Sequence, residues 1–162
     1  INGGRSLKDY KQVTRELSGK IIINSSLVLS KAKEESKVYN PSTMKEIGYI
    51  ALCRDEDINI AVNVADKAQQ EWKNLSAKER GALIQKCGNL LKNHQEELAK
   101  IISYETGKAI RTESRVEASV VADIFNFYGG LALELKGQTI PFDPNMLIYT
   151  IRQPLGVVGA II

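Results

Sequence analysis

Residues 153–162 read QPLGVVGAII, and this stretch decides how the rest of the chain is interpreted. From Val157 onward it carries no charge and no side-chain hydrogen-bonding group, and it follows a Pro-Leu-Gly turn. Short apolar runs rich in β-branched residues are typical of buried strands in parallel sheets. Such a strand needs partners on both edges, because its backbone N–H and C=O groups must be paired. We therefore expect an α/β protein, of which these 162 residues are one part.

Four helices are predicted upstream of this terminal strand. Apolar residues recur every three or four positions from Asp55, and Ser76 with Glu79 forms a capping box that opens a second helix. A third, short helix closes at Gly107, and a fourth runs from about Thr112 to Leu135. We expect the large apolar side chains to form the buried faces of the second and fourth helices: Leu83, Ile84, Cys87, Leu90 and Leu91, and Val116, Val120, Ile124, Phe127 and Leu131.

Strands are predicted on both sides of this helical cluster. The first third of the chain is predicted to be rich in β-strands. One hairpin turn is expected at Asn24-Ser25-Ser26 and another at Asn40-Pro41-Ser42-Thr43. A third hairpin turns at Asp143-Pro144-Asn145. The fold class expected for these 162 residues taken alone is therefore α+β. The pair Gly129-Gly130 in mid-helix indicates that another backbone passes very close.

Composition narrows the classes of function. The chain is 43% hydrophobic and 25% charged, as is ordinary for a folded protein, and its net charge of +3 is spread among interleaved acidic and basic residues. We therefore expect no nucleic-acid partner. No uncharged run approaches the ~20 residues of a membrane span, so no membrane is expected and the cytoplasm is the default. Cys53 and Cys87 are interpreted as buried, reduced thiols.

The residues alone predict no catalytic machinery. His94, the single histidine, lies between two helices, where a structural role is the first interpretation. The glycines at 156 and 159 lack the pattern of a phosphate-binding loop and are interpreted as packing positions. Glu105 to Lys108 is typical of a helix C-terminus, and Glu117 of a solvated helix edge. These patterns contain no nucleophile, general base or metal cluster.

Five stretches nevertheless resemble a known family, in order and in spacing. They are YNPSTMKEIGYI (39–50), AVNVADKAQQEW (61–72), ETGKAI (105–110), FYGGLALELKGQTIP (127–141) and YTIRQPLGVVGAII (149–162). Together they resemble the N-terminal part of the NAD(P)-dependent aldehyde dehydrogenases. The resemblance extends from about Lys37 to Ile162, whereas residues 1–36 form an arm without a match.

This resemblance implies a division of the chain. Residues 37–136 would be the N-terminal helical part of the cofactor domain, 137–153 a hairpin through which subunits oligomerise, and 154–162 the first strand of a Rossmann-like sheet. The family's oxyanion-binding Asn, catalytic Cys and general-base Glu have no counterpart here. Neither cysteine of this chain lies in a Gly-Gln-x-Cys context.

A few residues match functional positions of the family. Ile161 and Ile162 match residues that line the adenosine side of the cofactor cleft. Glu117 and Val120 match a helix that borders the aldehyde entrance. Glu105 matches a carboxylate of a monovalent-cation site.

The resemblance implies that the full-length protein uses NAD or NADP to oxidise an aldehyde to a carboxylic acid, as a homo-oligomer. The 127–142 stretch is most similar to the betaine-aldehyde and amino-aldehyde branch. This chain alone is expected to be inactive. The alternative is a truncated, non-catalytic module that binds a partner through its hairpin and terminal strand.

Overall fold

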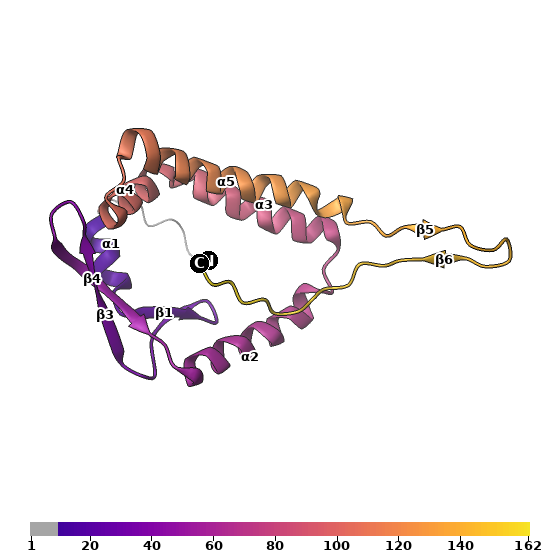
Figure 1. The fold of residues 1–162 in the computed structure, drawn as a ribbon, viewed down its shortest axis with the longest axis horizontal. Coiled ribbons are helices and arrows are strands. Elements are labelled where there is room, and N and C mark those ends of the chain that lie inside the picture. Colours follow the sequence, from indigo (N-terminus) through magenta and orange to yellow (C-terminus); the bar gives the residue numbers. More distant parts are fainter. Residues whose placement is uncertain (1–9) are drawn as a thin grey trace.

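The computed structural model describes residues 10–162 (Figure 1). Its helices and strands follow one another in the order α1 (Tyr10–Leu17), β1 (Lys20–Ile23), β2 (Ser26–Leu29), β3 (Glu34–Asn40), β4 (Lys45–Leu52), α2 (Asp55–Trp72), α3 (Ala77–Asn93), α4 (Gln95–Thr106), η1 (Ile110–Ser114), α5 (Arg115–Gly130), η2 (Leu131–Glu134), β5 (Thr139–Ile140) and β6 (Ile148–Tyr149). The strands form antiparallel pairs, β1 with β2, β3 with β4 and β5 with β6. The mixture of helix and strand confirms the predicted fold class.

Helix α1 differs from the sequence-based prediction, which places residues before Lys20 in a β-rich third of the chain. Its eight residues pack against α4 and β4. The chain then leaves the helix through Gly19, whose φ of +68° lies in the left-handed region that favours glycine. The helical period of a segment this short is too brief to be distinguished from a strand.

Both N-terminal hairpins turn where the sequence predicts. Asn24 and Ser25, with φ of +51° and +59°, join β1 to β2. In the second turn the Asn40 side-chain oxygen accepts hydrogen bonds from the backbone N–H of Ser42 at 2.9 Å and of Thr43 at 3.1 Å. This arrangement is the Asx turn that the Asn-Pro sequence favours.

Asp57 in the first turn of α2 is buried and fixes the β1–β2 hairpin to the helix. Its carboxylate accepts hydrogen bonds from the Ser30 hydroxyl at 2.7 Å and the Lys31 N–H at 2.8 Å. The backbone N–H of Arg54 approaches the same carboxylate at 3.4 Å. Hydrogen bonds from Lys31 and Ser30 lower the pKa of Asp57, because they favour the ionised form.

Helices α3 and α5 lie side by side and form the most extensive helix contact (Figure 1). The contact is made by small residues, since Gly81, Gly88, Ala118, Ala122 and Gly129 are the buried positions of apolar or glycine type on the two helices. A Cβ added to Gly129 would lie 2.8 Å from the Gly81 carbonyl oxygen. The close backbone approach predicted from Gly129 is therefore confirmed.

The expectation that the large apolar side chains form the buried helix faces is wrong. Those of Leu83, Leu90, Val116, Val120, Ile124, Phe127 and Leu131 are exposed, because the small residues occupy the contact and turn the larger ones outward. Both cysteines are exposed for related reasons: Cys87 lies outside the α3–α5 contact, and Cys53 follows the end of β4. The prediction that both thiols are buried is therefore also wrong.

The β5–β6 hairpin projects away from the end of the α3–α5 pair (Figure 1). Thr139 pairs with Tyr149, and Met146 N–H donates to the Asp143 carbonyl oxygen at 3.0 Å across the predicted turn. The terminal run that follows forms no strand within the described residues, and Leu155, Val158, Ile161 and Ile162 are exposed. The expected buried strand is not formed, because no neighbouring strand pairs with it here.

One helical stretch among residues 10–162, Ile110–Glu134, is long and apolar enough to cross a membrane by length and composition. Its first turns carry Arg111, Glu113, Arg115 and Glu117, and one side of it packs against α3. Length and composition alone are weak evidence, so this helix by itself does not indicate a membrane role.

Candidate functional site

The N-terminal end of α5 presents the two residues that were matched to a substrate entrance. A π-turn, η1, precedes the helix, and the N–H of Ser114 donates to the Ala109 carbonyl oxygen five residues back at 3.1 Å. Such turns insert one extra residue, and they are frequent near functional sites. Glu117 and Val120 follow on α5, three residues apart and therefore on one face. Val120 is 46% exposed, so this face is open.

Glu117 is held by an ion pair with Lys108. The two charged groups come from opposite ends of the π-turn, and each side chain is about two-fifths exposed, at 43% and 41%. The sequence predicts Lys108 at a helix C-terminus and Glu117 on a solvated helix edge. The pairing could not be anticipated, because the π-turn changes the spacing between them.

A second ion pair fixes the start of α5 against α4. Arg115 Nε lies 2.6 Å from Glu96 Oε1, and Gln95 donates to the Arg115 carbonyl oxygen at 3.3 Å. The hydrogen bond from Arg115 lowers the pKa of Glu96. Beneath these contacts the Ser114 side chain is fully buried, and its hydroxyl oxygen has no hydrogen-bond partner. These contacts hold the start of α5 against α4.

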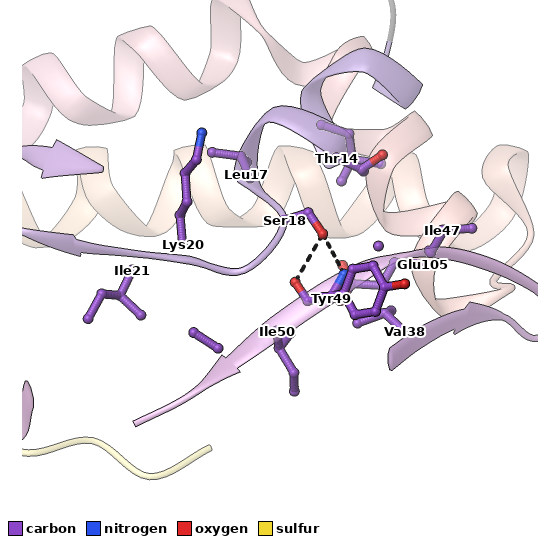
Figure 2. A pocket seen from close by; sticks show the side chains of 13 residues that line it. Thr14, Leu17, Ser18, Lys20, Ile21, Val38, Ile47, Tyr49, Ile50 and Glu105 are labelled. Carbon is purple, nitrogen blue, oxygen red and sulfur yellow. Dashed lines mark hydrogen bonds between the residues drawn. The ribbon is translucent and has the colours of Figure 1, made fainter. Parts of the chain in front are cut away.

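Glu105 lies elsewhere, in the last turn of α4, where it lines a cavity of about 290 Å³ with residues of α1 and β4 (Figure 2). Its carboxylate is exposed. No group of three or more His, Cys, Asp or Glu side chains that could hold a metal ion occurs among residues 10–162. A cation at Glu105 would therefore need hydroxyl or backbone oxygen atoms as its other ligands, which is the preference of alkali and other hard cations. The Thr14 hydroxyl lines the same cavity.

His94 has the structural role that was expected. It is the residue at which α3 ends and α4 begins, and its Nδ1 lies 2.5 Å from Glu97 Oε2 in the first turn of α4. The contact fixes the corner between the two helices.

Ile161 and Ile162 are fully exposed and lie in no strand. Gly159 has open space around it. The residues described here therefore do not fit a complete dinucleotide site. Of the sequence-predicted residues, only Glu117 and Val120 share a face.

A comparison with protein families supplies the decisive observation. Residues 28–162 match the model of the aldehyde dehydrogenase family. The chain belongs to this family. The aldehyde dehydrogenase match begins nine residues earlier than the resemblance read from the sequence, and it leaves α1 and β1 outside.

Individual aldehyde dehydrogenases agree with this assignment. The chain is 34% identical over 144 residues to the mitochondrial aldehyde dehydrogenase family 2 member B4 of Arabidopsis thaliana, covering 88% of this chain and 27% of that protein. It is 38% identical over 145 residues to an aldehyde dehydrogenase-like protein of Schizosaccharomyces pombe, covering 88% and 29%.

The three-dimensional fold matches as well. The NAD+ complex of aldehyde dehydrogenase from Bacillus cereus superimposes with a TM-score of 0.81 at 28% identity, over 88% of this chain and 30% of that one. The chain therefore has the fold of the N-terminal portion of an aldehyde dehydrogenase, and it spans less than a third of the length of these relatives.

Proposed function

We propose that the full-length protein oxidises an aldehyde to a carboxylic acid with NAD+ or NADP+ as the electron acceptor. The observation that carries this proposal is the family match over residues 28–162, and the bound NAD+ of the Bacillus cereus relative supports the cofactor. When bound, the nicotinamide accepts a hydride from the substrate. The catalytic thiolate and general base must come from outside these 162 residues, because neither cysteine has the sequence context of the family nucleophile.

The chain by itself is proposed to be inactive and to supply structure and one wall of the substrate path. Glu117 and Val120 are the residues assigned to that wall, and Lys108 fixes the Glu117 carboxylate there. Ile161 and Ile162 are assigned to the adenosine side of the cofactor cleft, which requires that the terminal run joins a sheet. The division at 36, 136 and 153 remains the proposed domain organisation.

The substrate proposed for the first test is betaine aldehyde or an amino-aldehyde. The support is the similarity of FYGGLALELKGQTIPF at 127–142 to that branch of the family. Glu105 is proposed to contribute to a monovalent-cation site. The protein is also proposed to be cytoplasmic. It is proposed to form homo-oligomers through the 137–153 hairpin, and the projection of β5 and β6 from the helices supports this oligomerisation (Figure 1).

The test uses the full-length protein with betaine aldehyde, an aliphatic amino-aldehyde and an uncharged aldehyde of similar size. Reduced cofactor is measured with NAD+ and with NADP+. Aldehyde-dependent reduction supports the function, and the order of kcat/KM among the substrates decides the branch. No reduction with any aldehyde would overturn the proposal, provided that circular dichroism shows a folded protein.

A second candidate function is a non-catalytic assembly module, which the projecting hairpin and the exposed run at 155–162 favour. The two functions are separated by mixing this chain with an aldehyde dehydrogenase that lacks the corresponding N-terminal portion. Recovery of catalytic activity supports the enzyme, whereas binding without activity supports the module.

A further inference from the structure

Within residues 10–162, α1 and β1 contact β4, and the backbone hydrogen bonds to the outer edge of β4 are made at Tyr49. The N–H of Tyr49 donates to the Ser18 hydroxyl at 2.6 Å (Figure 2). The Tyr49 carbonyl oxygen accepts from the N–H of Gly19 at 2.8 Å. Because backbone groups alternate between the two edges of a strand, Ala51 directs its N–H and C=O to the same outer edge. The other edge of β4 is paired with β3.

Helix α1 precedes this contact, and its attachment is weak. The helix has eight residues, fewer than an isolated helix needs to be stable. A cavity of about 290 Å³ is lined by residues of α1, β4 and α4, so their packing is incomplete, and Leu17 is 45% exposed. The helix also lies outside the residues that match the aldehyde dehydrogenase family. The segment 10–19 therefore lies outside the family match, and the hydrogen bonds of Ser18 and Gly19 to β4 all involve the backbone of one residue, Tyr49.

The strand beneath it has the composition of a self-pairing segment. Residues 47–52 read IGYIAL, with no charge and no proline, and three of the six are β-branched or aromatic. Six-residue segments of this kind pair with identical copies when their edges are free. Covering the edge with a helix or loop is one way in which folded proteins protect it.

We propose that residues 10–19 act as a strap that protects the edge of β4, and that release of this strap lets Ile47–Leu52 pair with the same segment of a second copy. The strap would make self-association of this chain conditional. This inference does not depend on the proposed enzymatic function, because it concerns only the edge of one strand.

Gly48 offers a way to release the strap without altering the edge. A Cβ at this position would lie 3.1 Å from Ser18 Oγ and 3.6 Å from the Thr14 carbonyl oxygen, so the larger side chain of Gly48→Val would displace α1. Ser36→Val is the matched control, because it adds the same side chain at an exposed position of β3. Ala51→Pro removes an N–H from the outer edge and leaves the β3 side intact, which blocks strand addition.

The experiment uses the whole chain with Cys87→Ser, so that a nitroxide label attaches only at the exposed Cys53 beyond β4. We expect Gly48→Val to accelerate amide exchange in residues 10–19 roughly tenfold, as the loss of one or two hydrogen bonds would. A discrete distance between Cys53 labels of two copies should appear at the same time. It should be absent in Ser36→Val and lost again when Ala51→Pro is added.

Three results would overturn the proposal. They are unchanged exchange in Gly48→Val, faster exchange without any intermolecular distance, and a distance that persists with Ala51→Pro. Ser18→Ala provides a second route to release if Gly48→Val does not fold, since it removes the hydroxyl bonded to Tyr49.

Discussion

Gly81 and Gly129 face each other across the α3–α5 contact so closely that a Cβ on Gly81 would lie 2.5 Å from the Gly129 carbonyl oxygen. The two backbones therefore meet without intervening side chains. This contact determines which face of each helix is buried and leaves the larger apolar residues outside.

Alanine at either glycine should destabilise the fold. Gly81→Ala and Gly129→Ala each force the helices apart, and overpacking of this kind costs about 1–3 kcal/mol of unfolding free energy. Gly130→Ala is the matched control, because its nearest neighbour would be 3.7 Å away and its φ of −66° is helical. Urea denaturation should show the control to be neutral or more stable. Equal losses at all three positions would contradict the close contact.

Removal of the α3 cap should weaken that helix. The Ser76 hydroxyl accepts from the Glu79 N–H at 3.2 Å, and the Glu79 carboxylate accepts from the Ser76 N–H at 2.8 Å. Ser76→Ala should lower the unfolding free energy by about 1 kcal/mol. Glu79→Gln keeps an oxygen acceptor and should therefore lower the unfolding free energy by less than Ser76→Ala does. Thermal unfolding followed by circular dichroism gives both values, and the reverse order would refute the capping box.

The stability of the β1–β2 attachment should depend on the ionisation of Asp57. Hydrogen bonds from Lys31 and Ser30 lower the pKa of Asp57 in the folded state, so its contribution is complete above the unfolded pKa, about 4. It is then lost as pH falls through the lower, folded pKa. Asp57→Asn should be less stable at neutral pH, and its stability should vary less with pH below about 4.

Amide exchange of residues 30–32, measured from pH 7 downward, checks this expectation. Asp55→Asn is the control, since Asp55 is exposed in the same helical turn. The account fails if the two variants show the same pH dependence.

The Lys108–Glu117 ion pair should contribute little to stability. A double-mutant cycle with Lys108→Met and Glu117→Gln should give a coupling of about 0.2–1 kcal/mol, because both side chains are partly exposed, and salt should reduce it. The more exposed pair Lys136–Glu134 is the control and should couple less. A larger coupling in the control would show that the π-turn does not hold Glu117.

Local signals in the sequence predicted the helices and hairpins well. The capping box at Ser76, the turn at Asn40 and the left-handed Gly107 at the end of α4 each act through neighbouring backbone groups, so sequence spacing is sufficient to predict them. The buried faces could not be predicted in this way. Apolar periodicity identifies a stripe, but whether small or large residues take the contact depends on a partner helix.

The candidate site shows the same limit. The pairing of Lys108 with Glu117 depends on a π-turn that no sequence pattern predicts. The burial of Ser114 cannot be predicted from its sequence neighbours either. The terminal run has the composition of a strand but no partner strand, so composition alone predicts a strand that does not form here. What the sequence did supply was the ordered set of motifs that pointed to the aldehyde dehydrogenases.

The central claim is that this chain is the N-terminal portion of an aldehyde dehydrogenase and that it carries neither the complete cofactor site nor the catalytic groups. Calorimetric titration of NAD+ into the 162-residue chain, followed by addition of an aldehyde and measurement of NADH, tests it most directly. The account predicts no saturable heat and no NADH. Saturable binding, or NADH that depends on the aldehyde, would contradict it.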